Sequence, residues 1–191
     1  MPTIVPALFR YPLGDDAALI LRTPDIAEAY NELTVANIDR LARWEPWAAT
    51  TPSLERTRGF LEAGAKGWVD GAQLPVAIAV PADGGWRLVG SAGLRIDRFL
   101  RSGEIGYWID AAYEGRGLVT RAVTTLVDAG FRQYGLGRLT IGAIVDNVRS
   151  RAVAERLGFT EEGILRGAIP FGADRRDEVV YGLLAEDWKG E

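Results

Sequence analysis

The sequence predicts a mixed α/β domain built in layers, and three observations lead to that prediction. Apolar runs of strand length alternate with segments whose apolar residues recur every three or four positions, as on one face of a helix. Along the chain these segments give the order β-α-α-α-β-β-β-α-β-α-β-β. Antiparallel neighbours come first and a β-α-β unit follows, which is typical of a sheet flanked by helices. The length of 191 residues suits one domain, so we expect residues 1–191 to form a single unit.

The first third of the chain is expected to form one strand and then three helices. Thr23 followed by Pro24 is a helix-start signature, since threonine caps a helix and proline fits its first position. Pro46 stops the second helix, because proline cannot continue an α-helix. Thr51 or Ser53 caps the third. The expected ranges are 18–22 for the strand, then 23–33, 37–47 and 51–68 for the helices.

Three strands are expected to follow. The first two are apolar runs of strand length, and the segment 80–85 between them contains proline, aspartate and two glycines, which predicts a hairpin turn. In the third, polar and apolar residues alternate clearly from Glu104 to Ile109, as in a half-buried strand. The expected ranges are 73–80, 86–96 and 103–109.

The last third is expected to hold two helices and three strands. The first helix carries apolar residues three and four apart over its whole length, which predicts one amphipathic face. The second has Asn147 as its N-cap and Gly158 as its C-terminal stop. The expected ranges are helix 118–134, strand 138–145, helix 147–159, and strands 159–166 and 175–184.

Composition limits the chemistry that the protein can perform. The net charge is −4 and forms no basic block, so neither a nucleic-acid surface nor a charged tail is expected. No apolar run is long enough to span a membrane and the N-terminus does not resemble a signal peptide, so we expect a cytoplasmic protein. There is no histidine and no cysteine, which excludes a Ser-His-Asp triad, an imidazole base, a thiolate nucleophile and sulfur ligands for a metal. No metal is expected.

A glycine-rich loop between a strand and a helix is the first candidate site. Gly115 and Gly117 precede a helix that starts near Leu118. The first N–H groups of a helix lack internal partners and carry the positive end of its dipole, and glycines let a ligand approach them closely. This arrangement suits phosphate or pyrophosphate. Arg116 adds a cation, and the hydroxyl of Thr120 lies one turn further on.

Taken alone, the loop is a weak signal, and a tight turn that binds nothing is the favoured interpretation, because most two-glycine turns before helices bind no ligand. Its glycine spacing does not match the dinucleotide-binding fingerprint, because no third glycine falls in register. It does not match the ATP-binding P-loop either, because no Lys-Ser/Thr pair follows.

Several separated motifs in a fixed order are more specific than the loop. They are Glu104-Ile105-Gly106-Tyr107, then Glu114-Gly115-Arg116-Gly117, then Asn147 and Ser150 ahead of Leu157-Gly158-Phe159. Asn37, Trp44 and Trp47 in the N-terminal helices and the closing "VVYGLLAEDW" complete the pattern. With these motifs the chain resembles the Gcn5-related N-acetyltransferases (GNAT), and among them the RimJ/RimL branch, over about residues 6–189.

Three positions depart from the family pattern. The phosphate loop of the family usually begins with Gln or Arg, where this chain has Glu114, and usually ends with Gly or Ala, where it has Val119. A carboxylate at position 114 would repel a pyrophosphate unless it points away from it. Many wider family members carry a tyrosine acid in the second helix, and Ala154 occupies the matching position here.

The resemblance implies a mostly antiparallel central sheet flanked by helices, with a splayed β-α-β site for acetyl-CoA. It also implies that an amine attacks the thioester directly, with no covalent enzyme intermediate and no metal. Backbone N–H groups of the loop would hold the pyrophosphate, and an N–H near Trp108 to Asp110 would polarise the thioester carbonyl. The implied cofactor-binding residues are Trp108, Ile109, Asp110, Glu114, Gly115, Arg116, Gly117, Leu118, Val119, Thr120 and Asn147.

The same resemblance implies three catalytic residues, each with a purely structural alternative. Glu104 is the candidate base, acting through water, and is otherwise the polar residue of an alternating strand. Asn147 would bind the pantetheine arm or the thioester, and is otherwise only a helix cap. Ser150 would protonate or hydrogen-bond the leaving thiolate, and is otherwise a solvated helix hydroxyl.

The acceptor is left open among several classes. Asn37, Trp44 and Trp47 are implied to border the acceptor cleft, although the two tryptophans could equally be core residues. The branch acts on N-termini of ribosomal proteins, so a protein α-amine leads. A small amine, such as a polyamine or an aminated antibiotic, is the second reading, and a domain that binds CoA without turnover is the third. The branch often forms dimers, so the resemblance allows a homodimer.

Overall fold

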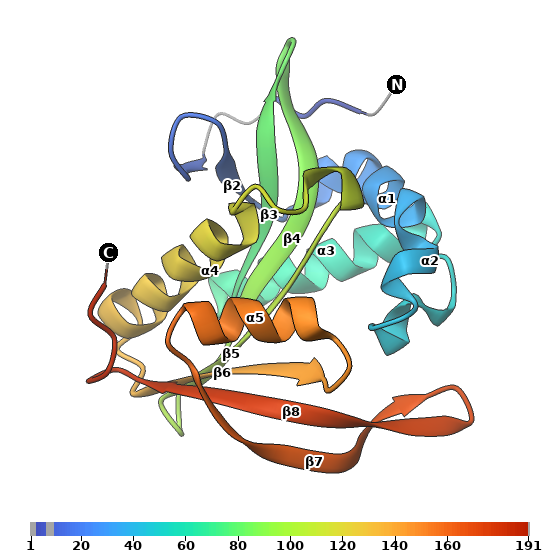
Figure 1. The fold of residues 1–191 in the computed structure, drawn as a ribbon. Coiled ribbons are helices and arrows are strands. Elements are labelled where there is room, and N and C mark those ends of the chain that lie inside the picture. Colours follow the sequence, from blue (N-terminus) through green and yellow to red (C-terminus); the bar gives the residue numbers. More distant parts are fainter. Residues whose placement is uncertain (1–2, 7–9, 191) are drawn as a thin grey trace.

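One eight-stranded sheet organises the computed structural model, which describes residues 3–6 and 10–190 (Figure 1). The spatial order is β1-β2-β3-β4-β5-β6-β8-β7, and every neighbouring pair is antiparallel except β5 and β6. The strands are β1 Tyr11–Pro12, β2 Ala18–Leu21, β3 Gln73–Ala82, β4 Gly85–Asp97, β5 Ser102–Ile109, β6 Arg138–Ile144, β7 Thr160–Phe171 and β8 Asp174–Leu184. Residues 1–2, 7–9 and 191, part of the expected unit 1–191, lie outside the described residues.

The helices follow the order that the sequence predicts. They are α1 Ala27–Ala36, α2 Ile38–Leu41, α3 Leu54–Val69, α4 Leu118–Asp128 and α5 Val148–Arg156, with short 3₁₀ helices η1 Pro24–Ile26, η2 Pro46–Ala49 and η3 Ala111–Tyr113. The mixed α/β fold and the expected element order are confirmed, with the two-residue strand β1 added before them. The helix expected over 118–134 divides into α4 and a π-helical segment, η4 Ala129–Gln133.

The helices cover both faces of the sheet. Apolar side chains of α1 and α3 pack against one face at β2, β3 and β4, where Tyr30 and Leu61 belong to the same cluster as Ala77. Those of α4 and α5 pack against the other face, where Leu126 and Ala154 are fully buried. Figure 1 shows α4 and α5 in front of the sheet and α3 passing behind it. The sheet therefore has an α1/α3 face and an α4/α5 face. Among the described residues no helix is long and apolar enough to cross a membrane.

Two of the expected helix caps form as predicted. The Ser53 hydroxyl accepts a hydrogen bond from the Arg56 N–H at 3.2 Å, which decides between the two candidates for the start of α3. The Asn147 side chain accepts from the Ser150 N–H at 3.3 Å and so caps α5. Thr23 is extended but makes no cap, because its hydroxyl donates to the Asp25 carboxylate instead.

The parallel strands β5 and β6 separate along their length. Their register runs only from Ser102 to Glu104, opposite 138–140. Beyond that point β5 stays paired with β4 as far as Ile109, while β6 stays paired with β8 as far as Ile144. Each strand thus keeps one neighbour and loses the other. The inner edges of β5 and β6 bound a splay that opens towards the start of α4, as the sequence resemblance implies.

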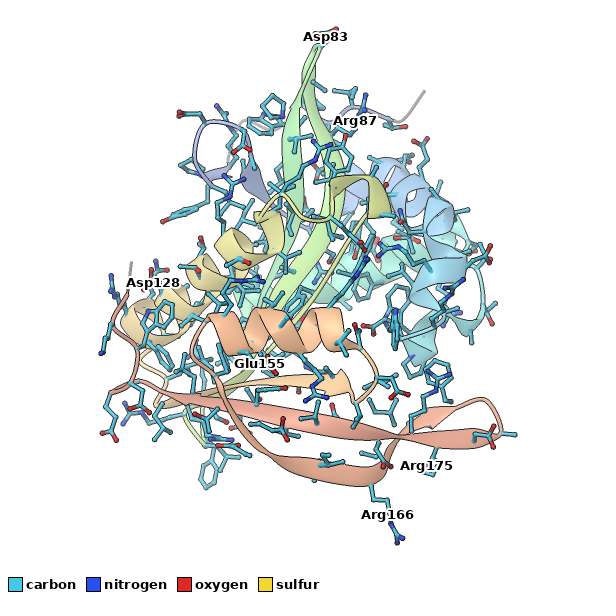
Figure 2. The ribbon with its side chains drawn as sticks, viewed as in Figure 1. Asp83, Arg87, Asp128, Glu155, Arg166 and Arg175 are labelled. Carbon is cyan, nitrogen blue, oxygen red and sulfur yellow. The ribbon has the colours of Figure 1, made fainter. Side chains whose placement is uncertain are left out.

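The outer edge of the sheet is protected by charge and irregularity. β7 is the edge strand at the end of the sheet opposite β1, and its pairing with β8 shifts register twice, at Glu161/Gly163 and at Leu165/Ile169. Figure 2 shows Arg166, inside the second irregularity, pointing away from the sheet. Irregular pairing and an exposed cation both hinder edge-to-edge aggregation.

A pair of glycine substitutions tests how closely β4 and β5 pack at the splayed end. A Cβ on Gly90 would lie 2.6 Å from the Trp108 carbonyl oxygen and 3.2 Å from the Ile109 Cα. Because both atoms are backbone, we expect Gly90→Ala to lower the free energy of unfolding by about 1–3 kcal/mol in urea denaturation. The matched control is Gly106→Ala on β5, where a Cβ meets nothing within 4 Å. Equal stability of the two variants would contradict this packing.

Candidate functional site

The loop before α4 presents a run of unpaired backbone donors. In the described residues the N–H groups from Gly115 to Thr120 donate to no protein acceptor. Gly115 and Gly117 have φ of 75° and 71°, in the left-handed region that favours glycine. A Cβ on either glycine would meet nothing within 4 Å, so the space in front of these amides is open. Unpaired N–H groups at the start of a helix are the donors that an anion site requires, and the anion site itself stays a prediction.

The side chains of the loop anchor it and leave the backbone to face solvent. Leu118 is 2% exposed and packs in the core of the α4/α5 face, which fixes the first turn of α4. Val119 packs against the same cluster. Arg116 folds back on the loop, with its guanidinium carbon 4.7 Å from the ring centre of Tyr113. The Thr120 hydroxyl accepts a hydrogen bond from Arg156 of α5 at 3.2 Å, which brings a second cation to this loop.

Glu114, the unusual first residue of the loop, is neutralised by two guanidinium groups. One carboxylate oxygen lies 2.6 Å from Arg40 Nη1 of α2, and the other pairs with Arg149 of α5. Two positive charges therefore surround one negative charge. The repulsion that a carboxylate at this position would exert on a phosphate is offset within the protein itself.

The backbone of β5 alternates in direction, and this alternation decides which N–H groups face the splay. The Asp110 N–H donates to the Val89 carbonyl of β4 at 2.7 Å, so it points away from the splay. Successive residues of a strand point their N–H and C=O groups to opposite sides. The N–H groups of Ile109 and Tyr107 therefore face the splay, whereas that of Trp108 faces β4. Of the expected segment Trp108 to Asp110, only Ile109 offers a donor there.

Tyr107 of β5 reaches across the splay to the first turn of α5. Its hydroxyl donates to the Ser150 carbonyl at 2.9 Å and accepts from the Ser150 hydroxyl at 3.2 Å. Burial raises the pKa of Tyr107 to about 12, although the hydrogen bond from Ser150 acts in the opposite direction. The phenol is therefore protonated at neutral pH. Ser150 and the cap residue Asn147 thus lie on the α4/α5 side of the splay.

Glu104 lies on the opposite face of the sheet, at the base of the splay. Its side chain is 50% exposed and forms an ion pair of 2.5 Å with Arg95 of β4. It borders a pocket of about 480 Å³ together with Thr140 of β6. Strand alternation places Gly106 and Trp108 on the same face as Glu104. Gly106 leaves that face open, and Trp108 packs edge-on against Tyr30 of α1 with ring centres 6.2 Å apart.

A second carboxylate, which the sequence did not indicate, lies near Glu104. Glu178 of β8 places an oxygen 2.2 Å from where a Cβ on Gly142 would be, so its carboxylate covers the glycine of β6. Burial raises the pKa of Glu178, the charge of Glu104 raises it further, and Arg95 acts in the opposite direction. Two carboxylates and the Arg95 guanidinium therefore lie together at the base of the splay.

The residues expected to border an acceptor cleft have different environments. Asn37 is 6% exposed and donates to the Asp110 carboxylate at 3.2 Å, so it joins α1 to the end of β5. Trp44 is partly buried, whereas Trp47 is 44% exposed and donates its indole N–H to Glu45 at 2.9 Å. Burial raises the pKa of the Glu45 carboxyl, and that hydrogen bond opposes the shift.

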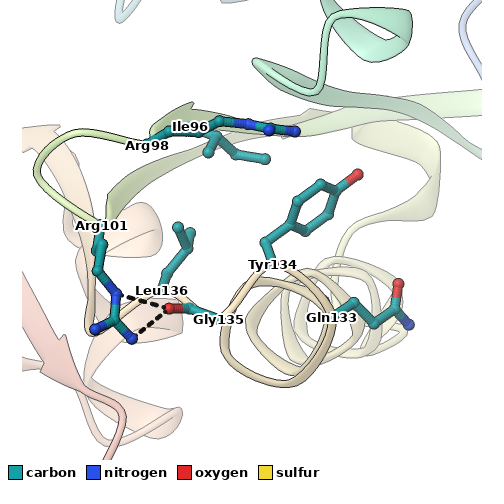
Figure 3. Close-up of a pocket in the computed structure, with 7 residues that line it drawn as sticks. All are labelled: Ile96, Arg98, Arg101, Gln133, Tyr134, Gly135 and Leu136. Carbon is teal, nitrogen blue, oxygen red and sulfur yellow. Dashed lines mark hydrogen bonds between the residues drawn. The ribbon is translucent and has the colours of Figure 1, made fainter.

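A further pocket lies away from these groups. It has a volume of about 370 Å³ and lies between the β4–β5 turn and the segment that follows α4. Figure 3 shows Arg101 at its rim, where the guanidinium donates to the Gly135 carbonyl at 2.9 Å and 3.2 Å. The pocket lies at the opposite end of α4 from Gly117, so it does not belong to the anion site.

Besides Glu178, sequence reasoning missed four residues of the site, and it missed all four for the same reason. Arg40 and Arg149 pair with Glu114 across 74 and 35 positions, and Tyr107 meets Ser150 across 43. Arg156 reaches Thr120 across 36 positions. Each residue looks like an ordinary polar member of its own helix or strand. Only the fold brings its partner to it.

Comparisons with known proteins agree with this geometry. A family model described as an acetyltransferase (GNAT) domain matches residues 18–160. The "Putative ribosomal N-acetyltransferase YdaF" of Bacillus subtilis is 33% identical over 186 residues, which is 96% of this chain and 100% of that protein.

Two solved structures share the fold over most of the chain. RimJ of Mycobacterium smegmatis in complex with CoA-disulfide has a TM-score of 0.82 and 26% identity, over 100% of this chain and 91% of that one. The microcin C7 self-immunity acetyltransferase MccE, in complex with acetyl-CoA and AMP, has a TM-score of 0.82 and 26% identity, over 90% and 94%.

A charge placed in the loop tests the anion site. We expect Gly117→Asp to weaken binding of coenzyme A at least tenfold in calorimetry, because it puts a carboxylate and a side chain where the open amides face. The substitution also strains a residue with φ of 71°.

A matched control separates strain from charge at the site. Gly84 has φ of 82° and open space around it, and Figure 2 shows its neighbour Asp83 at the tip of the β3–β4 hairpin. Gly84→Asp therefore carries similar strain but should leave coenzyme A binding unchanged. Equal loss of binding in both variants would show that strain, and not the anion site, is responsible.

Proposed function

The chain belongs to the GNAT acetyltransferase family and is an acyltransferase, and on that premise we propose that it transfers the acetyl group of acetyl-CoA to the α-amine at a protein N-terminus. The observation that carries the choice of co-substrate is the run of unpaired N–H groups from Gly115 to Thr120 beside the splay. The choice of acceptor is supported by the full-length similarity to a putative ribosomal N-acetyltransferase.

The pyrophosphate of acetyl-CoA would bind at the head of α4. Backbone N–H groups from Gly115 to Thr120 face open space there, and the helix dipole favours negative charge at that end. Arg116 and Arg156 lie beside the loop as additional cations. Glu114, expected to be part of the phosphate site, offers no free donor, because its N–H donates to the Ala111 carbonyl and its carboxylate is engaged by Arg40 and Arg149.

The acyl end of the co-substrate would enter the splay between β5 and β6. A thioester carbonyl there can accept a hydrogen bond from the N–H of Ile109 or of Tyr107 as negative charge develops on its oxygen. A preorganised donor of this kind lowers an acyl-transfer barrier by roughly 3–4 kcal/mol. Asn147, at the start of α5, would bind the pantetheine arm.

The sheet separates the incoming amine from the departing thiol. Glu104 and Trp108 project to the α1/α3 face, where the amine would approach, near Asn37, Trp44 and Trp47. Tyr107 projects to the α4/α5 face, where Ser150 would meet the thiolate. The thiol of coenzyme A, with a reference pKa of about 8.5, is a stronger acid than the phenol of Tyr107. A phenol of pKa about 12 would therefore not protonate the thiolate. The Ser150 hydroxyl donates its one proton to Tyr107, so it would have to turn from Tyr107 to the sulfur to hydrogen-bond the thiolate.

The base has to act over a distance. Glu104 precedes Ile109 by five strand positions, which is about 16 Å along β5, and precedes Tyr107 by three, about 10 Å. Either distance requires water between the carboxylate and the amine. An α-amine has a pKa of about 8, so a modest base acting through water is sufficient for it.

A thiol-release assay with acetyl-CoA tests the acceptor class. The central comparison uses a lysine-free peptide with a free N-terminus and the same peptide acetylated at its N-terminus with one lysine added. We expect release with the first and little with the second. Release only with small amines such as polyamines would favour the alternative that the protein acetylates small molecules. The similarity to a microcin self-immunity acetyltransferase supports testing that alternative. Binding of coenzyme A without release by any amine would contradict the proposal.

Replacing the proposed base should change the pH profile. We expect Glu104→Gln to slow acetyl transfer most at low pH, where more of the amine is protonated, and to leave the affinity for coenzyme A nearly unchanged. The measurement is kcat/KM against pH, with coenzyme A affinity from calorimetry.

The ion pair with Arg95 provides the control for Glu104. Arg95→Gln removes the same ion pair but keeps the carboxylate, so it should not reproduce the low-pH defect. Identical profiles in the two variants, or loss of coenzyme A binding in Glu104→Gln, would mean that Glu104 is structural.

A further inference from the structure

Arg40 connects three parts of the molecule whose relative positions matter for the proposed reaction. It lies in α2, with its side chain 31% exposed, and its Nη1 is 2.6 Å from the Glu114 carboxylate at the start of the phosphate loop. Its Nη2 donates to the Ile109 carbonyl at the end of β5 and to the Asn37 side-chain oxygen, the latter at 3.3 Å. One guanidinium thus joins α2, the last residue of β5 and the loop before α4.

The carbonyl of Ile109 needs such a partner because of the splay. Both the N–H and the C=O of Ile109 point to the side where β6 has left, so no strand satisfies them. An unpaired carbonyl at the end of a strand leaves that end poorly fixed. Arg40 binds this carbonyl, and it thereby holds the residue whose N–H faces the thioester in the proposed reaction.

Glu114 in turn fixes Arg40. The two side chains are 31% and 26% exposed, so solvent screens this ion pair less than an open surface pair. Arg149, the other partner of Glu114, is 78% exposed and contributes less for that reason. Glu114 therefore serves mainly as the counter-ion of Arg40, which explains how a carboxylate is tolerated at a position that usually carries Gln or Arg.

We propose that Arg40 is a positioning residue for acetyl transfer, acting through the Ile109 carbonyl, and that Glu114 positions Arg40. The inference rests on the proposed function, because it takes the Ile109 N–H as a donor to the thioester. In this proposal Glu114, although it lies in the phosphate loop, acts on the end of the site that binds the acyl group and does not contact the phosphates. A guanidinium is needed, since a lysine ammonium cannot span three acceptors in fixed directions.

The test compares Arg40→Gln, Arg40→Lys, Glu114→Gln and the double variant Arg40→Gln/Glu114→Gln. We expect Arg40→Gln and Glu114→Gln to lower kcat about tenfold and the affinity for coenzyme A by no more than about twofold. The double variant should be no slower than Arg40→Gln alone, because Glu114 acts through Arg40. Arg40→Lys should recover only part of the kcat that Arg40→Gln loses. If Arg40→Gln folds poorly, Arg40→Lys takes its place in the comparison with the wild-type protein.

The matched control is an ion pair of the same length elsewhere. Arg58 lies 2.6 Å from Glu28 between α3 and α1, and both side chains are more exposed. Arg58→Gln should leave kcat and coenzyme A affinity unchanged. A tenfold loss of kcat in this control as well would overturn the specific role of Arg40.

Amide hydrogen exchange at Trp108 and Asp110, whose N–H groups face β4, separates this inference from the proposed function. Faster exchange there in Arg40→Gln and Glu114→Gln, but not in Arg58→Gln, supports the anchoring role even if the wild-type protein acetylates no amine. Unchanged exchange overturns it. It is also overturned if Glu114→Gln binds coenzyme A several times more tightly and keeps its kcat, because Glu114 would then act on the phosphates.

Discussion

The parting of β5 and β6 is the constraint on which the rest of the structure depends. The two strands share register only over Ser102–Glu104, yet each stays fully paired on its other side. Rigid neighbours therefore hold the gap open, and it does not depend on loops. Backbone groups that β6 would otherwise satisfy become available to a ligand, and the chain leaves β5 directly into the loop at the head of α4. One change in strand pairing thus produces both the proposed acyl site and the access to the proposed anion site.

Because the chain has no histidine or cysteine, catalysis must depend on how backbone N–H groups and charged side chains are positioned. The described site consists of backbone N–H groups, arginines, carboxylates and one tyrosine, none of which is a strong base or nucleophile at neutral pH. The paired arginines at Glu114 offset a charge that would oppose a phosphate. On the other side of the sheet, Glu104 and Glu178 remain close enough for one to raise the pKa of the other. Arginines thus surround the loop, whereas two carboxylates and Arg95 share the base of the α1/α3 face.

The sequence predicted what depends on local periodicity and caps, and it could not predict what depends on distant contacts. The element order, the Asn147 cap and the mixed sheet are confirmed, because apolar spacing and capping chemistry act within a few residues. The direction of each β5 amide was not predictable, since it follows from pairing with β4. The environment of Glu114 was not predictable either, because Arg40 is 74 positions away. The proposed roles of Glu104, Ser150 and Trp47 stay predictions, since placement alone does not assign a proton transfer.

The indirect action of the proposed base, Glu104, also bears on which amine the site would use. At pH 7 roughly one α-amine in ten is neutral, whereas for a lysine side chain of pKa about 10.4 the fraction is lower by a few hundredfold. A carboxylate that must act through water, with an arginine 2.5 Å away, is poorly suited to make up that difference. An α-amine needs far less help from a base, because roughly a tenth of it is already neutral at pH 7. With Glu104 as the proposed base, the chemistry at the splay therefore favours an N-terminal amine over a lysine side chain.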